Sequence, residues 1–326
     1  MLNVGLANIK ELMQWDSFID QSSNGTLFHK KSFLSYHSKR FDPYEEFVVW
    51  KKGGQVFAVM PAAVNVNNGV KSLISPYGAS FGGPVFKRPL RLREGLEVVR
   101  SLKGYLADND IDYCRMVLAP SIYSKFICET LQYCLEKDGF LIKSRDVFTV
   151  IELAGKTYEQ VWSEYEGRAR TAVRKSIDMF ELKANSSLEE FYSILLEDKQ
   201  RHNSSKPTHS LADLLKIKEL FPDRVWADVA THRATGAKAA VCYFAVTNEV
   251  VMTFYMAQET SALKLNGVNV LVDAGIKRAI DYGFKYFDFG GSTVGYNIEN
   301  IGVANFKESF GAHSTSRYTY EWEARE

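Results

Sequence analysis

The chain has 326 residues, of which 46% are hydrophobic and 24% are charged; these proportions are ordinary for a globular protein and exclude a largely disordered one. Its 40 Lys and Arg residues face 39 Asp and Glu residues, and the formal net charge of +1 excludes the strong basic excess of a general nucleic-acid binder. At this length we expect two domains rather than one.

The N-terminal segment and the cysteines bear on the cellular compartment. The segment is polar and lacks the apolar stretch of a signal peptide, and no apolar run reaches the roughly 18 residues that span a bilayer. The four cysteines form no Cys-x-x-Cys pair and have no histidine at zinc-ligand spacing. We therefore expect a cytoplasmic protein with reduced, buried thiols, no metal site and no membrane span.

The first half of the chain opens with short helical patterns and then alternates strands with helices. A double glycine, Gly53-Gly54, between two β-rich runs is typical of a hairpin. The predicted elements are helices over 9–20 and 28–36, a hairpin over 47–64, a strand over 70–74, a glycine-rich loop over 75–83, a helix over 96–107, a strand over 112–119, a helix over 122–137 and a strand over 147–153.

The second half repeats this order. The predicted elements are helical patterns over 158–177 and 187–202, a hairpin over 226–246 turning at Thr235-Gly236, a strand over 250–257, a helix over 268–282 and a strand over 285–289. Hairpin, strand, glycine-bearing loop, helix and strand thus occur twice, which indicates a duplicated α/β domain. A helix between two strands predicts a βαβ unit with a parallel strand pair.

The start of the helix in the second βαβ unit is a candidate anion site. Free N–H groups and the positive end of the helix dipole gather at such a point. Gly267 would let a ligand approach the backbone, and Asn266 and Asn269 can cap the helix or bind a phosphate. Lys264 precedes them. A plainly capped helix start explains the same residues equally simply.

Two charged residues follow in the last quarter of the chain. Asp288 ends a predicted buried strand just before Gly290-Gly291, where a carboxylate can orient or deprotonate an amine or can cap the turn. Lys307 follows Phe306 in a segment that is otherwise apolar or small. A lysine there can bind a diphosphate or stabilise a developing oxyanion, although most lysines are solvated.

Taken together, these segments resemble the Fem-type nonribosomal peptidyltransferases and their acetyltransferase relatives. The resemblance is carried by Asn266-Gly267…Asn269, by Tyr286-Phe287-Asp288-Phe289-Gly290-Gly291 and by Gly302-Val303…Asn305-Phe306-Lys307…Phe310-Gly311. Less specific matches in the first half are Phe28-His29 and Gly82-Gly83-Pro84. The resemblance implies an α/β protein of two tandem GNAT-like domains (the fold of acyl-CoA N-acyltransferases), with mixed sheets flanked by helices.

The resemblance also implies roles for single residues. Residues 1–150 would form a first domain that shapes the acceptor pocket, and residues 151–326 a second domain for cofactor binding and catalysis. Lys307 and Asp288 would be catalytic, and Lys264, Asn266, Gly267 and Asn269 would hold the cofactor pyrophosphate. The expected substrate-binding residues are Arg168, Arg170, Arg201, His202, Tyr77, Phe81 and Tyr255.

The expected reaction is N-acyl transfer from acyl-CoA, with no metal, to the amino group of a nucleotide-linked (dTDP) amino sugar in surface polysaccharide biosynthesis. The charge balance and the lack of an inserted helical arm disfavour tRNA as a partner. Two alternatives remain. One is an aminoacyl-tRNA-dependent transferase that builds peptidoglycan interpeptide bridges, and the other is a non-catalytic binding protein on a decayed transferase fold.

Overall fold

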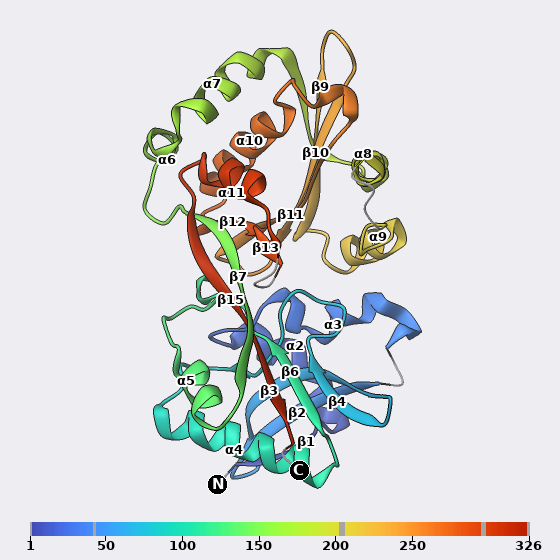
Figure 1. Ribbon diagram of the computed structural model, residues 1–326, viewed down its shortest axis with the longest axis vertical. Coiled ribbons are helices and arrows are strands. Elements are labelled where there is room, and N and C mark those ends of the chain that lie inside the picture. Colours follow the sequence, from blue (N-terminus) through green and yellow to red (C-terminus); the bar gives the residue numbers. More distant parts are fainter. Residues whose placement is uncertain (1, 42–43, 202–205, 295–297, 325–326) are drawn as a thin grey trace. The chain divides into compact units, whose positions relative to one another are not determined.

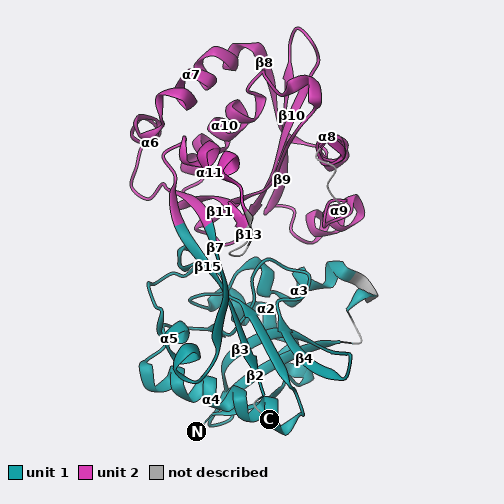
Figure 2. Cartoon of the chain, in the orientation of Figure 1, with its two compact units in different colours: residues 1–147, 294–298, 315–326 teal, residues 148–293, 299–314 magenta. Residues whose placement is uncertain are grey.

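The computed structural model describes residues 2–41, 44–201, 206–294 and 298–324. The chain divides into two compact units (Figure 2). Unit 1 contains residues 1–147, 294–298 and 315–326, and unit 2 contains residues 148–293 and 299–314. The chain enters unit 2 within strand β7 (Leu141–Glu152), and it returns to unit 1 within strand β15 (His313–Glu323).

Unit 1 is built on a mixed sheet with the strand order β1-β2-β3-β4-β6-β15. The β2–β3 hairpin turns at Gly53-Gly54, where φ values of 56° and 81° favour glycine. Strands β4 and β6 pair in parallel, from Ser72 with Tyr113 to Ser75 with Met116. The strand bounds are β1 Asn3–Leu6, β2 Glu45–Lys52, β3 Gln55–Asn67, β4 Val70–Ser75, β5 Val85–Phe86 and β6 Tyr113–Val117.

The helices of unit 1 cover the sheet. Helix α4 is amphipathic and turns Val98, Leu102 and Leu106 into a core that also holds Trp50 and Tyr320. Helix α2 packs on a smaller cluster around Val49 and Val59. The helices are α1 Ile9–Met13, α2 Trp15–Gln21, α3 Lys31–Leu34, α4 Leu92–Asp108 and α5 Thr130–Lys137, with 3₁₀ turns at Leu27–His29, Ser35–Arg40 and Ser121–Tyr123.

Unit 2 repeats the arrangement with the strand order β7-β12-β11-β10-β9-β8. Helices α8 and α9 lie on one side of the β9–β11 strands, and α7, α10 and α11 lie on the other (Figure 1). The strands are β8 Phe180–Ser186, β9 Val225–His232, β10 Lys238–Ala245, β11 Val250–Gln258, β12 Tyr286–Gly291, β13 Thr293–Val294 and β14 Ile298–Glu299. The helices are α6 Tyr158–Glu164, α7 Gly167–Ser176, α8 Leu188–Arg201, α9 Leu211–Leu220, α10 Gly267–Asp281 and α11 Ile301–Glu308, with 3₁₀ turns at Ile177–Met179 and Thr260–Ala262.

Both hairpins and both parallel strand pairs predicted from the sequence are confirmed. Two of the helical patterns are interrupted. The pattern over 9–20 breaks at Gln14, and the pattern over 158–177 breaks at Tyr165, where the backbone is extended. The prediction of a helix over 122–137 is wrong in its first half, since α5 begins only at Thr130.

Two further features concern the cysteines and the composition of the helices. Cys114, Cys134 and Cys242 are buried and Cys128 is half-buried, and all four are free thiols. In the part of the chain that is described, no helix combines the length and the apolar composition that crossing a membrane would require.

Candidate active site

In unit 2 the parallel strands β11 and β12 separate soon after they meet. Their pairing runs from Val250 with Tyr286 to Met252 with Asp288. Beyond that point β11 continues beside β10 to Gln258, while β12 pairs with β7 at Phe148. A β-bulge at Phe254 adds local twist to β11. Ligands in α/β folds bind at the carboxyl ends of such strands.

Asp288 is the last residue of the parallel pairing and is fully buried. Its Oδ1 accepts a hydrogen bond of 2.6 Å from the backbone N–H of Gly290, whose φ is 73°. The sequence allowed two roles for Asp288, catalysis and capping of the glycine turn, and this hydrogen bond is the capping one. The carboxylate therefore fixes the turn that ends β12.

Lys307 on α11 reaches the same turn. Its side chain is only 2% exposed, and Nζ donates to the carbonyl oxygens of Gly290 at 3.0 Å and Gly291 at 2.7 Å. An ammonium has three N–H groups, and no other described residue accepts the third. Burial lowers the pKa of Lys307 to about 8, while the negative charge of Asp288 opposes that shift. The site thus holds a desolvated cation that is still mostly protonated at pH 7.

The start of α10 is more closed than the sequence suggested. Gly267 is buried, and a Cβ added there would lie 2.9 Å from the Cβ of Ala239 and 3.0 Å from the ring of Phe180. Packing against these side chains therefore explains the glycine without a ligand. Asn266 has φ 59°, and its Nδ2 donates to the Ser176 hydroxyl at 3.2 Å.

Beside this helix start lies an open cavity of about 400 Å³. Asn269 lines it from α10, Arg168 from α7, and Gly302, Asn305 and Phe306 from α11. Arg168 is exposed, and its Nη2 donates to the Asn305 carbonyl at 2.6 Å. The structure thus brings together two of the predicted residues, Arg168 and Asn269, next to the helix that carries Lys307. A cavity with a guanidinium, an amide and a helix N-terminus suits an anionic group.

Several other predicted residues lie elsewhere in unit 2. Lys264 is exposed just before α10 and does not line the cavity. Arg170 is half-buried and donates to the carbonyl of Ser163 at 3.1 Å. Arg201 pairs with Asp198 and donates at 2.9 Å to the carbonyl of Gln258, at the end of β11. His202 lies outside the described residues.

Tyr255 is the substrate-binding candidate on β11. Its hydroxyl lies 2.9 Å from Nδ1 of His209, and burial raises its pKa to about 12. No local sequence pattern points to His209, because the pair joins a loop to a strand 46 residues away. Arg201, the last residue of α8, thus contacts the end of β11, and Tyr255 lies within that strand.

In unit 1 the two aromatic candidates of the glycine-rich loop are buried. Phe81 packs edge-on against Phe28 at 5.4 Å and beside Tyr123, and Tyr77 packs against Phe41 at 5.5 Å. Both rings belong to an aromatic cluster and line none of the cavities described for this unit. Pro76, Ala79 and Ser80 of the same loop do line a cavity.

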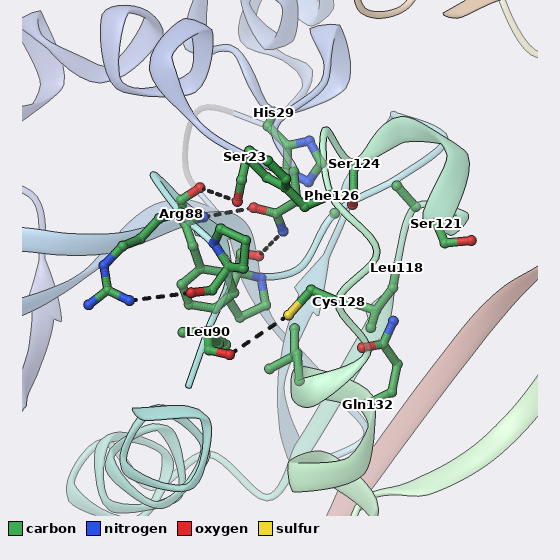
Figure 3. Close-up of a pocket in the computed structure, with 17 residues that line it drawn as sticks. Ser23, His29, Arg88, Leu90, Leu118, Ser121, Ser124, Phe126, Cys128 and Gln132 are labelled. Carbon is green, nitrogen blue, oxygen red and sulfur yellow. Dashed lines mark hydrogen bonds between the residues drawn. The ribbon is translucent and has the colours of Figure 1, made fainter. Parts of the chain in front are cut away.

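The less specific family-like segments of unit 1 meet at a small pocket (Figure 3). His29, Gly82 and Pro84 line it, together with Arg88 and Cys128. Its volume of about 50 Å³ admits one or two water molecules and no substrate. His29 is buried, which lowers its pKa to about 4, and its Nδ1 accepts from the backbone N–H of Thr26. The imidazole is therefore neutral near pH 7, and its Nδ1 is engaged by this hydrogen bond.

Among the described residues, no group of three or more His, Cys, Asp and Glu side chains could hold a metal ion. No protein-family model matches the chain, and no curated protein matches its sequence. Solved structures do match it in fold. The structure titled "Crystal structure of FemX" has a TM-score of 0.72 at 10% identity, over 99% of this chain and 97% of that one.

Two further structures share the fold. A tandem GNAT protein from the clavulanic acid biosynthesis pathway has a TM-score of 0.54 at 12% identity, over 100% of this chain and 99% of that one. The structure of L-PGS from Bacillus licheniformis has a TM-score of 0.59 at 10% identity, over 98% and 94%. These likenesses confirm the expected fold class, an α/β protein of two tandem GNAT-like domains with mixed sheets flanked by helices.

Proposed function

We propose that the protein is an N-acyltransferase whose catalytic centre lies in unit 2, at the end of β12. The observation that carries this proposal is the buried ammonium of Lys307, held by the carbonyls of Gly290 and Gly291 where β11 and β12 separate. A preorganised cation in a water-poor site stabilises the oxyanion that develops during acyl transfer. The likeness in fold to a tandem GNAT protein and to FemX supports the same reaction class.

The chemistry then assigns a task to each residue. The acceptor amine attacks the acyl carbonyl carbon, and Lys307 donates its remaining N–H to the carbonyl oxygen as negative charge develops there. The C–N bond forms, the C–S bond of the thioester breaks, and the leaving thiolate takes up a proton equivalent to the one that the amine loses to water. Asp288 is a positioning residue, because its carboxylate fixes the turn whose carbonyls hold Lys307.

The proposed donor is acyl-CoA. The cavity lined by Arg168 and Asn269 supports this choice, because a guanidinium and a helix N-terminus together suit a diphosphate. Asn266 and Gly267 contribute less than the sequence suggested, since both are engaged in packing or in the bond to Ser176. Lys264 is exposed and does not line this cavity, so its side chain would have to extend along the surface to reach a bound diphosphate.

The proposed acceptor is the amino group of a nucleotide-linked (dTDP) amino sugar, of the kind used in cytoplasmic steps of surface polysaccharide biosynthesis. In this proposal Arg201 and Tyr255 belong to the acceptor side, whereas Tyr77 and Phe81 are buried in the aromatic cluster of unit 1 and line none of its described cavities. Arg201, the last residue of α8, donates to the Gln258 carbonyl at the end of β11, and Tyr255 lies within that strand.

A second candidate is transfer from aminoacyl-tRNA to a peptidoglycan precursor. One specific observation favours it: Phe180, Ala239 and Ser176 pack around the start of α10 and narrow the cradle for a CoA diphosphate. The TM-score of 0.72 with FemX points the same way. The ester of an aminoacyl-tRNA would break at a C–O bond, and Lys307 would keep the same role.

The test is an assay of the purified protein with acyl-CoA and a panel of dTDP-linked and UDP-linked amino sugars, in which release of free thiol is followed. The proposal expects thiol release that depends on the acceptor. Transfer with aminoacyl-tRNA and no thiol release with any acceptor would replace the CoA donor by the second candidate. No transfer with either donor, and no calorimetric binding of CoA or nucleotide sugar, would favour a non-catalytic protein.

Lys307→Ala is the matching variant. It should lower turnover by about 10²-fold or more, because it removes the proposed oxyanion donor. Lys216→Ala is its control, since that lysine is exposed on α9 and pairs with Glu219 on the same helix. Near-normal turnover of a folded Lys307→Ala protein would remove Lys307 from the mechanism.

A further inference from the structure

A polar cavity of about 430 Å³ lies in unit 1, over the carboxyl ends of the parallel strands β4 and β6. Its polar lining consists of Arg115, Arg317, Asp146, Ser80, Ser144 and Thr319. None of these residues stood out in the sequence. Because ligands in α/β folds bind beyond the carboxyl ends of parallel strands, the place itself suits a binding site. The volume falls within the roughly 300–1,000 Å³ of small-molecule pockets.

One of the two arginines is fixed in place by a buried carboxylate. Arg317 donates from Nε at 3.1 Å and from Nη2 at 2.6 Å to Oδ2 of Asp146. The Asp146 side chain is only 3% exposed, and that of Arg317 is 26% exposed. The carboxylate therefore orients the guanidinium plane and leaves part of it facing the cavity. A guanidinium held in this way loses little conformational entropy when it binds an anion.

The second arginine is only loosely paired. The Arg115 side chain is 47% exposed, and its Nε lies 4.0 Å from Oε1 of Glu321, at the outer limit of an ion pair. The other carboxylate oxygen of Glu321 lies 3.4 Å from Nζ of Lys143. Glu321 is thus shared between two cations. Among the side chains that line the cavity, Arg115 and Arg317 face the single carboxylate of Asp146, so one positive charge is in excess.

We infer that this cavity binds an oxyanion group, a phosphate or a carboxylate, of a small-molecule ligand. The inference goes beyond the proposed function and does not depend on it, because Arg115 and Arg317 would contact the acidic group within unit 1 alone. Bidentate guanidinium contacts suit both kinds of oxyanion. The hydroxyls of Ser80 and Ser144 suit the hydroxyl groups of a sugar, and Ile74 and Val117 provide an apolar wall for its ring.

The test measures binding without any donor, by calorimetry on the full chain. The probes are glucose 1-phosphate and dTDP for a phosphate, glucuronate for a carboxylate, and glucosamine as the probe without an acidic group. Arg115→Ala should weaken binding of the preferred acidic probe at least about tenfold, since a charge-assisted hydrogen bond is lost. Arg115→Lys should recover part of that loss. Arg93→Ala, on a side chain that is 92% exposed on α4, is the matched control.

The outcomes separate this site from the proposed reaction. Equal binding of an acidic probe to wild type and Arg115→Ala, or no binding of any acidic probe at millimolar concentration, would overturn the inference. Probe binding that depends on Arg115, with no acyl transfer from any donor, would keep the site and remove the proposed function. Acyl transfer by a protein in which Arg115→Ala leaves probe binding unchanged would keep the function and remove the site.

Discussion

Lys307 and His29 are both buried bases, and burial lowers the pKa of each, but the consequences differ. Lys307 keeps its proton near neutral pH because its ordinary pKa is high, so that lowering it to about 8 leaves a cation. His29 starts near 6.5 and falls to about 4, so it is neutral. The first residue can therefore act as a cation on developing negative charge near neutral pH, and the second cannot.

The pKa of Lys307 predicts the alkaline limb of the pH–rate profile. Turnover should fall above about pH 8, because the ammonium that stabilises the oxyanion loses its proton there. The measurement is kcat between pH 6 and 10 with saturating substrates. Arg does not titrate in this range, so Lys307→Arg should lose this limb even if its overall rate is low. An unchanged limb in Lys307→Arg would assign it to another group.

His29 predicts a pH dependence of stability. Its folded-state pKa of about 4 lies below the unfolded value of 6.5, so between these values the unfolded chain binds a proton that the folded chain does not. The free energy of unfolding is therefore unaffected by His29 above pH 6.5. It decreases as the pH falls toward 4, by up to about 3 kcal/mol.

Urea unfolding at pH 7.5, 6, 5 and 4.5 measures this loss. His29→Gln should lose stability at pH 7.5 and show a weaker decline on acidification. A decline equally steep in both proteins would show that carboxylates, and not His29, cause the acid sensitivity.

At the scale of elements, the strongest local sequence signals predict the two hairpins that the structure contains. Both hairpins carry glycines at positive φ, Gly53, Gly54 and Gly236, so the turn is encoded where it occurs. The helix expected over 122–137 fails for a different reason. Phe126 and Ile127 fit a helical apolar face, yet they are 56% and 95% exposed in a loop. Apolar periodicity predicts a helix only where the apolar side chains are buried, and these two side chains are not buried.

Other elements and most of the site's contacts depend on the tertiary structure. The start of helix α9 carries a local sequence signal, since Ser210 and Asp213 form a capping box. The helix is nevertheless not predicted from the sequence, because the residues around this start are polar. No local pattern predicts the contact between Lys307 and the carbonyls of Gly290 and Gly291, which lie 17 and 16 positions earlier in the chain. The pairs His209–Tyr255 and Arg317–Asp146 join residues 46 and 171 positions apart, and no local pattern encodes them.

Helix α10 also offers a test of packing. A Cβ at Gly275 would lie 2.5 Å from the Tyr243 hydroxyl oxygen and 2.9 Å from its ring, so Gly275→Ala should destabilise unit 2 by about 1–3 kcal/mol. Gly104→Ala on α4 is the matched control, because nothing lies within 4 Å of its added Cβ. It should stabilise the protein by about 0.5–1 kcal/mol. Denaturant unfolding measures both, and equal effects would contradict the packing of α10 on β10.

At the scale of the whole molecule, unit 1 is not a continuous piece of chain. Its strand β6 pairs with β15, from Val117 with Thr319 to Tyr113 with Glu323. Tyr320 of β15 is 1% exposed in the core of unit 1, and its hydroxyl donates to Glu136 on α5 at 2.9 Å. The division at residue 150 expected from the sequence was drawn from element order, which carries no information on a strand contributed from the other end of the chain.

This arrangement predicts the behaviour of fragments. Residues 1–147 alone should fail to unfold cooperatively, because β6 lacks its neighbour and the core lacks Tyr320. Fusing residues 313–324 to that fragment through a Gly-Ser linker should restore a sharp thermal transition. The same fusion with Tyr320→Ala should restore it poorly, since truncating a buried aromatic costs about 3–5 kcal/mol. A cooperative transition in the bare fragment would contradict the prediction.

Strand β15 is synthesised long after the other strands of unit 1, and this delay affects folding during translation. A ribosome adds residues N-terminal first, at about 5–20 per second, so the stretch between residues 147 and 315 takes on the order of ten to thirty seconds. Throughout that time nascent unit 1 presents the backbone of β6 without its neighbour. An open strand edge recruits other chains. Synthesis of this protein should therefore depend on chaperones that shield the edge until translation delivers the missing strand.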